Sequence, residues 1–202
     1  MMVFRSLGLK RPRVDAEIAD RIPPGQYLTE RWPVLHYGDV PQFQPQSWSL
    51  KLFGTVEKPV DLSWNEFNDL PRTTVTADMH CVTRWSKLDM VWEGVSFKTI
   101  ADLVNPTPDA RHVLFVADID YSANIPLAVA MSDDVLLATH ANGEVLDPEH
   151  GYPLRSVVPR RYAWKSAKWL RAIEFIEDDR PGFWENYGYN NNADYTREER
   201  FA

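Results

Sequence analysis

Residues 73–86 read TTVTADMHCVTRWS and join a predicted β-strand to the one cysteine of the chain. From Thr73 to His80, residues that favour strands recur in alternation, which predicts a half-buried strand ending directly before Cys81. A lone cysteine cannot form an internal disulfide, so it is a small buried residue, a nucleophile or a soft ligand. Arg84 is close enough in sequence to favour the thiolate. The role of this thiol decides the function.

Composition excludes several classes of protein. The chain has 202 residues, of which 44% are apolar and 12% aromatic, enough for a sizeable core. Its 22 Lys and Arg against 29 Asp and Glu give a net charge of −7, which argues against a nucleic-acid partner. No apolar stretch is long enough for membrane insertion, and residues 1–14 lack the apolar region of a secretory signal. We therefore expect a cytoplasmic protein, consistent with a free thiol.

The chain is punctuated into short elements by 15 prolines and 9 glycines. Ser63 and Glu66 form a capping-box pattern that predicts a short helix, and a second helix is predicted from Phe97 to Val104 behind Ser96. We expect one domain over residues 1–202, with arms at about 1–46 and 181–202 that wrap the core. The class is α+β, with mixed β-sheets and short helices. Strands are predicted at 48–54, 73–80, 112–117, 135–139, 154–158 and 172–176.

A basic run interrupts this acidic chain. Between Arg155 and Arg171 there are six Lys or Arg and no Asp or Glu. Cations without acidic neighbours repel one another, so the run is either a solvated basic face or a site for an anion such as phosphate. The segment Lys165-Ser166-Ala167-Lys168 suits a phosphate, although it lacks the glycines of a Walker loop.

Common catalytic motifs are missing from the sequence. It contains no Gly-x-Gly-x-x-Gly, Gly-x-Ser-x-Gly, His-Glu-x-x-His or Cys-x-x-Cys. His80 and Cys81 are adjacent, so on a strand they would face opposite ways and would not share one metal. A zinc site is therefore not expected.

Several ordered motifs together resemble a known family. They are LHYG at 35–38, HCVTRWS at 80–86, WEGV at 92–95, NGE at 142–144, EHGYPLR at 149–155, VVP at 157–159, KSAKWL at 165–170 and PGFWE at 181–185. The chain resembles the sulfite-oxidase-like family of molybdopterin-dependent oxidoreductases over about residues 28–200. It is most similar to the short, single-domain bacterial members.

The resemblance implies the sulfite-oxidase molybdopterin-binding-domain fold and a molybdenum–molybdopterin cofactor. By motif position, Cys81 is the thiolate that ligates the metal, and a soft thiolate suits that role. Further catalytic or substrate-side candidates are Thr83, Arg84, Tyr121 and Asn124. The cofactor-binding candidates are His36 and Tyr37 in the N-terminal arm, His150 and Arg155 near the pterin, and Arg160, Lys165, Ser166 and Lys168 for its phosphate.

The family moves one oxygen atom and two electrons between water and a substrate heteroatom, commonly sulfur, and the cofactor carries that chemistry. We therefore expect a small sulfur- or nitrogen-containing substrate. A separate electron-transfer partner is expected because no haem-binding Cys-x-x-Cys-His is present. Sulfite oxidases carry an Arg pair where this chain has Trp85 and Ser86, which argues against sulfite.

The family pattern also has glycine at two further positions, Asp120 and Ala163. An alanine disfavours a positive φ, so we expect the loop at Ala163 to differ.

Two alternatives stay open at this stage. One is a non-catalytic carrier that holds the molybdopterin without turnover. The other is a metal-free redox thiol protein, which an exposed Cys81 far from the basic run would favour.

Overall fold

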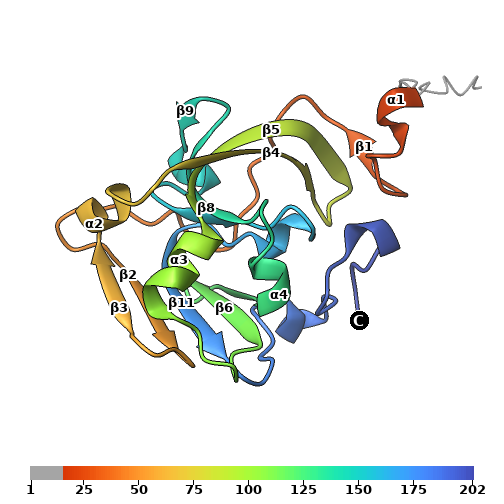
Figure 1. The fold of residues 1–202 in the computed structure, drawn as a ribbon. Helices are drawn as coiled ribbons and strands as arrows, with labels where there is room; N and C mark the ends of the chain where they lie inside the picture. Colours follow the sequence, from red (N-terminus) through yellow and green to blue (C-terminus); the bar gives the residue numbers. More distant parts are fainter. Residues whose placement is uncertain (1–15) are drawn as a thin grey trace, which may run out of the picture.

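Two β-sheets form the framework of the computed structural model, which describes residues 16–202 (Figure 1). The first sheet has the strand order β1-β5-β8-β10, with β4 also paired to β5 and β9 to β8. Its strands are β1 (Tyr27–Leu28), β4 (Thr73–His80), β5 (Trp85–Ser96), β8 (Leu136–Ala141), β9 (Glu144–Val145) and β10 (Arg155–Val157).

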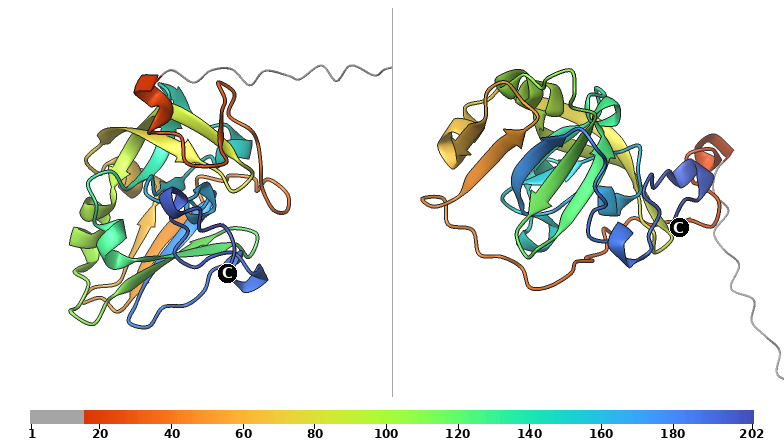
Figure 2. Two further views of the ribbon diagram at one scale, coloured as in Figure 1. Left: turned by 90° about the vertical axis from the view of Figure 1, so that its right-hand side faces the viewer. Right: turned by 90° about the horizontal axis from the view of Figure 1, so that it is seen from below.

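The second sheet has the order β3-β2-β11-β6-β7. Its strands are β2 (Ser49–Gly54), β3 (Val60–Ser63), β6 (His112–Ala117), β7 (Ser122–Pro126) and β11 (Leu170–Ile176). Both sheets are mixed, because β1 runs parallel to β5 and β11 parallel to β2 while the other pairs are antiparallel. Figure 2 shows the two sheets as separate layers.

The helices are short and lie around the sheets. They are α1 (Ala16–Ala19), α2 (Trp64–Asn68), α3 (Phe97–Val104) and α4 (Leu127–Ala130), with 3-10 turns η1 (Pro148–His150), η2 (Ala163–Lys165), η3 (Glu185–Tyr187) and η4 (Tyr195–Arg197). The expected α+β class with mixed sheets and short helices is confirmed.

Local sequence explains where the helices begin. Ser63 caps α2 through a reciprocal capping box with Glu66, a motif that contributes about 1 kcal/mol. The Ser96 side chain accepts a hydrogen bond from the Thr99 amide at the start of α3. The apolar face of α3 is then buried in the larger core, which also includes Phe67 of α2 and the inward side chains of the second sheet.

The predicted strands at 73–80 and 112–117 have the predicted bounds, and the others shift by one or two residues at their ends. The long strand β5 was not predicted. Its alternation is interrupted at Asp89, which has φ 54°, and the β4–β5 register shifts between Ala77 and Met79. Because of these irregularities, β5 lacks the regular two-residue alternation by which a strand is predicted from sequence.

Both arms approach the end of β4 from outside. Of the predicted N-terminal arm, residues 1–15 lie outside the described part. The remainder contributes β1, whose Tyr27 pairs with Trp85 directly after the Cys81 turn. The C-terminal arm meets it, because the Arg200 guanidinium donates to the Pro24 carbonyl at 3.2 Å.

Within residues 16–202, no helix is both long enough and apolar enough to cross a membrane.

Candidate active site

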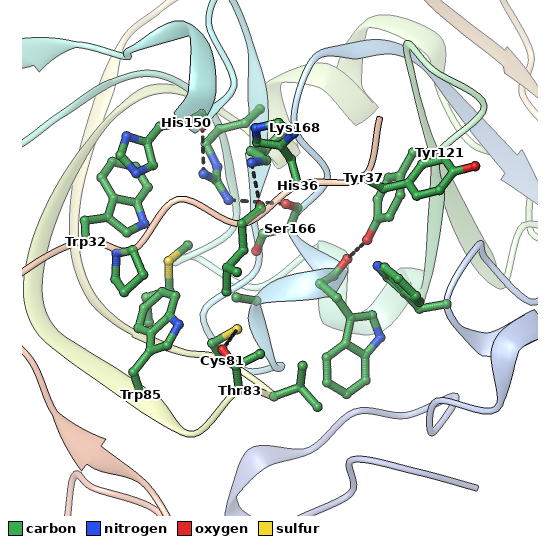
Figure 3. A pocket seen from close by; sticks show the side chains of 18 of the residues that line it. Trp32, His36, Tyr37, Cys81, Thr83, Trp85, Tyr121, His150, Ser166 and Lys168 are labelled. Atoms are coloured by element: carbon green, nitrogen blue, oxygen red, sulfur yellow. Dashed lines mark hydrogen bonds between the residues drawn. The ribbon is translucent and has the colours of Figure 1, made fainter. Parts of the chain in front are cut away.

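A cavity of about 250 Å³ opens beside Cys81. Its wall comes from segments far apart in the chain. They are residues 29–48 between β1 and β2, which we call the strap, the turn after β4, the β6–β7 loop, the region from η1 to the start of β11, and the C-terminal arm. Figure 3 shows many of these side chains converging on one space. The lining residues are Trp32, Pro33, Leu35, His36, Tyr37, Met79, Cys81, Val82, Thr83, Trp85, Ile119, Tyr121, His150, Arg155, Ala163, Trp164, Ser166, Lys168, Trp169, Trp184 and Tyr189.

Cys81 sits in a tight turn between β4 and β5. Its amide donates to the Trp85 carbonyl at 2.9 Å, and its carbonyl accepts from the Arg84 amide at 3.0 Å. Arg84 takes the left-handed conformation, with φ 73°, that this reversal requires. The thiol is buried, with the residue 8% exposed, yet Sγ lines the cavity and accepts a hydrogen bond from the Thr83 hydroxyl at 3.2 Å.

The environment of the thiol favours its protonated form while no metal is present. Burial raises the pKa of Cys81, and the Thr83 hydroxyl and the charge of Lys168 oppose that rise. A buried thiol that faces a cavity and shares it with a lysine does not match the exposed, isolated cysteine expected of a redox sensor.

Two cations in the cavity wall have no carboxylate partner among the described residues. Arg155 is 4% exposed, lies over the rings of Trp32 and Trp92, and donates to the carbonyls of His150 at 2.8 Å and Ser166 at 3.3 Å. Burial lowers the pKa of Arg155 to about 10. A guanidinium held this way keeps its charge at neutral pH and has no internal anion to balance it.

Lys168 is the second of these cations, and it also donates to backbone carbonyls. Its ammonium donates to the carbonyls of Leu35 at 2.7 Å and Glu149 at 2.8 Å. Burial and then the charge of Arg155 lower the pKa of Lys168 to about 7. Removing water from a cation and placing another cation nearby both destabilise the charged form, so an anion in the cavity would relieve both effects.

Buried polar atoms in the same wall are also unsatisfied. Among residues 16–202, neither Nε1 of Trp85 nor Nε2 of His150 has a hydrogen-bond partner. The His150 ring stacks on Trp32, with ring centroids 3.7 Å apart. Ser166 accepts from the Val158 amide at 3.0 Å, which leaves its hydroxyl proton free to donate. Orphaned buried groups of this kind mark a place for a bound polar molecule. A thiol, two cations and free donors fit a planar anionic cofactor that carries a soft metal.

The strap brings its predicted residues to the cavity mouth. His36 and Tyr37 are exposed there, and their rings pack against Trp169 and Phe183 at 5.5 and 4.5 Å. The Lys168 bond to the Leu35 carbonyl fastens the strap to the body. Residues 35–37 of the strap are therefore held by contacts with the site itself.

Nine of the predicted site residues share the cavity, and four do not line it. The nine are His36, Tyr37, Cys81, Thr83, Tyr121, His150, Arg155, Ser166 and Lys168. Of the other four, Arg84 is exposed, and Arg160 pairs with Asp134 at 3.3 Å. Lys165 pairs with Glu185 at 2.6 Å, and Asn124 accepts a hydrogen bond from Lys165 at 2.8 Å.

Tyr121 lines the cavity, but its hydroxyl is already used. It donates to the Trp164 carbonyl, and burial raises the pKa of this phenol well above its usual range. The ring can therefore shape the cavity, whereas the hydroxyl is not poised to exchange a proton.

Sequence reasoning missed the aromatic wall. Trp164, Trp184 and Tyr189 pack together, with centroids of Trp164 and Trp184 each about 5 Å from Tyr189. The aromatic richness of residues 181–202 was a signal for this wall, but its position depends on how the arm folds back. Met79 was also missed. It lies two residues before Cys81, a spacing that places both side chains on the same face of a strand.

Comparison with known proteins identifies the family. The oxidoreductase molybdopterin binding domain family matches residues 37–184. The uncharacterized oxidoreductase YuiH of Bacillus subtilis (strain 168) is 44% identical over 183 residues, covering 90% of this chain and 92% of the relative. The sulfite oxidase of Arabidopsis thaliana is 33% identical over 180 residues, covering 71% of this chain but only 46% of that enzyme.

A solved structure supports the fold. The sulfane dehydrogenase SoxCD from Paracoccus pantotrophus matches with a TM-score of 0.65 at 22% identity, covering 88% of this chain and 56% of that one. The chain therefore belongs to the sulfite-oxidase-like family of oxidoreductases with a molybdopterin-binding domain, and its cofactor is molybdenum–molybdopterin.

Proposed function

We propose that this protein transfers an oxygen atom to or from a small sulfur- or nitrogen-containing substrate at a molybdenum centre ligated by Cys81. The observation that carries the proposal is one cavity that combines the buried thiol with two cations, the buried Arg155 and the half-buried Lys168, that lack carboxylate partners in the described residues. When bound, the cofactor supplies the two-electron oxygen-atom exchange. The chain's own residues hold, orient and enclose it.

Cys81 is the proposed metal ligand. Because burial raises the pKa of its thiol, metal binding must displace a proton that the empty protein retains. The Thr83 hydroxyl bonded to Sγ supports the thiolate formed in this way. The turn fixed by the Trp85 carbonyl holds Sγ toward the cavity.

Arg155 and Lys168 are proposed to neutralise the anionic cofactor. Each side chain donates hydrogen bonds to backbone carbonyls, so each is held in place before the cofactor binds. Ser166, His150 and Trp85 add donors in the same wall. Arg160 and Lys165 were candidates for the phosphate by motif position, but their carboxylate partners leave less need for an anion.

The substrate is proposed to bind against the aromatic wall on the Thr83 side. Val82, Trp164, Trp184 and Tyr189 line this region, and none of them carries a positive charge. Such a wall favours a neutral S-oxide, N-oxide or thioether over the sulfite anion. The location we propose is cytoplasmic, and the electrons pass to or from a separate protein.

The test is metal analysis for molybdenum and tungsten, with oxidised-pterin fluorescence, on the wild type and on Cys81→Ser. Met79→Leu is the matched control, since it removes the neighbouring sulfur of the cavity wall at nearly constant volume. We expect about one molybdenum per chain in wild type and control, and at least a tenfold loss of metal in Cys81→Ser.

Three other results would redirect the proposal. Metal and pterin content unchanged in Cys81→Ser would rule out Cys81 as the ligand. A fully loaded protein that turns over no S-oxide, N-oxide or thioether would favour the carrier role. Absence of both metal and pterin, in protein from cells that make the cofactor, would overturn the proposal.

A further inference from the structure

Lys165 and Glu185 form an ion pair that is buried on both sides. Their side chains are 0% and 3% exposed, and Nζ lies 2.6 Å from Oε1. Every other ion pair in the described residues joins side chains that are both more than a tenth exposed. A charge pair withdrawn so completely from water needs good geometry and further hydrogen bonds to be tolerated.

Those further bonds connect three separate parts of the fold. The Lys165 ammonium also donates to Asn124 Oδ1 at 2.8 Å, which ties η2 to β7. The indole Nε1 of Trp164 donates to Glu185 Oε1 at 2.9 Å, which ties η2 to the C-terminal arm. The Gly182 amide donates to the same Asn124 oxygen at 3.2 Å. The pair is therefore a buried junction that helps to fasten the arm to the body, beside the backbone bonds from Phe183 to Ser122 and from Tyr162 to Ala193.

The residues next to this junction form the aromatic wall. Trp164 precedes Lys165, Trp184 precedes Glu185, and both line the cavity with Tyr189. Trp184 and Tyr189 stack with centroids 5.0 Å apart and planes 21° apart, and both belong to the C-terminal arm. The Trp164 carbonyl also accepts a hydrogen bond from the Tyr121 hydroxyl, which links the ring of Tyr121 to the same junction.

We propose that Lys165 is a positioning residue for the substrate wall and not a ligand of the cofactor phosphate. Paired with Glu185, it holds the C-terminal arm closed so that Trp164, Trp184 and Tyr189 present a fixed surface. This inference rests on the proposed function for the identity of the substrate side. The junction itself stands on contacts within the chain.

The pair gives a sharp double-mutant test. Lys165→Met leaves a buried carboxylate with Trp164 as its remaining donor. Glu185→Gln leaves a buried ammonium that faces only uncharged oxygens, those of Asn124 and of the new amide. Each single change strands a charge, whereas the double variant removes both charges and keeps an acceptor for the Trp164 indole. The double variant should therefore recover what each single variant loses. Lys98→Met with Asp133→Asn is the matched control, because that pair is exposed.

Three readouts separate the roles. The first is hydrogen–deuterium exchange of residues 182–191, which we expect to speed up at least tenfold in each single variant and to return within about threefold in the double variant. The second is pterin content, which should stay near wild type in Lys165→Met at temperatures where the protein is folded. The third is turnover of methionine sulfoxide as a probe S-oxide. In Lys165→Met, KM should rise about fivefold or more while kcat stays nearly unchanged.

Distinct outcomes would overturn this inference. If Lys165→Met loses its pterin and the double variant does not recover it, Lys165 is a cofactor ligand. If the single variants exchange no faster than Lys98→Met, the pair does not fasten the arm. A wild-type protein without cofactor would refute the proposed function, while the exchange experiment would still test the junction.

Discussion

Arg155 and Lys168 differ from Arg160 and Lys165, although all four belong to one basic run. The first two line the cavity and donate only to backbone carbonyls in the described structure. The other two lie outside the lining and have carboxylate partners, Asp134 and Glu185. Composition alone cannot distinguish these four cations. Their partners show that the first two can bind an anion in the cavity, whereas the other two stabilise the fold through ion pairs.

The partner of each cation decides how much positive potential that cation offers to an anionic ligand. A cation paired with a carboxylate contributes little net potential at a distance, because the two charges nearly cancel. A buried cation bonded only to carbonyls retains its field and carries a desolvation cost that an anionic ligand offsets. The cofactor is therefore expected to depend on Arg155 and Lys168 far more than on Arg160.

The largest effect in this comparison should come from Arg155→Met. The change removes the buried guanidinium charge that is proposed to neutralise the anionic cofactor, and a hydrogen bond from a charged group contributes about 1.5–3 kcal/mol. We expect pterin content to fall at least tenfold. Fluorescence of the released, oxidised pterin measures it, with thermal unfolding as the check on folding. Wild-type pterin content in a folded Arg155→Met variant would show that Arg155 does not hold the cofactor.

Lys168→Met should have an intermediate effect that depends on pH. The pKa of Lys168 is lowered to about 7 in the cofactor-free site, so its charge is present below that pH and is lost as pH rises through it. A bound anion favours the charged form. Wild-type protein should therefore retain the cofactor more firmly at pH 6 than at pH 8.

The variant should lose this pH difference and fall furthest behind wild type at pH 6. The rate of pterin release at the two pH values measures both effects. An equal pH dependence in wild type and Lys168→Met would show that this ammonium does not face the anion.

The smallest effect should come from Arg160→Met. The Arg160 side chain is 59% exposed, and its pair with Asp134 is of the exposed kind that contributes about 1 kcal/mol or less. Pterin content within about twofold of wild type is expected, with a nearly unchanged melting temperature. A loss as large as that of Arg155→Met would return Arg160 to the phosphate site and remove the division between the two groups.

Local chemistry explains which features could be predicted from sequence. The strand from Thr73 to His80 and the caps at Ser63 and Ser96 depend on neighbouring residues only, and the structure has them. The family motifs placed Cys81, Arg155 and Lys168 in one region, and they share one cavity.

Long-range partners explain what could not be predicted. Asp134 lies 26 positions from Arg160 in sequence, so no local pattern shows that this cation is paired. The same is true of Glu185, which reaches Lys165 only because the C-terminal arm folds back. The aromatic wall depends on that same fold.

The backbone conformation at two positions could also be compared with the expectation from sequence. Of the two positions where the family pattern has glycine, Asp120 adopts a positive φ of 56°, as a glycine site allows. Ala163 instead begins the 3-10 turn η2 and is not among the positive-φ residues of the described chain. The loop at Ala163 thus avoids the left-handed conformation that alanine disfavours.

Whether Cys81 binds the molybdenum of the cofactor in this cavity can be decided by X-ray absorption at the molybdenum edge. The two samples are wild type and Cys81→Ser with whatever metal it retains. We expect the variant to lose one sulfur ligand from the metal and to gain a lighter one. Identical sulfur coordination in the two proteins would rule out Cys81 as the ligand.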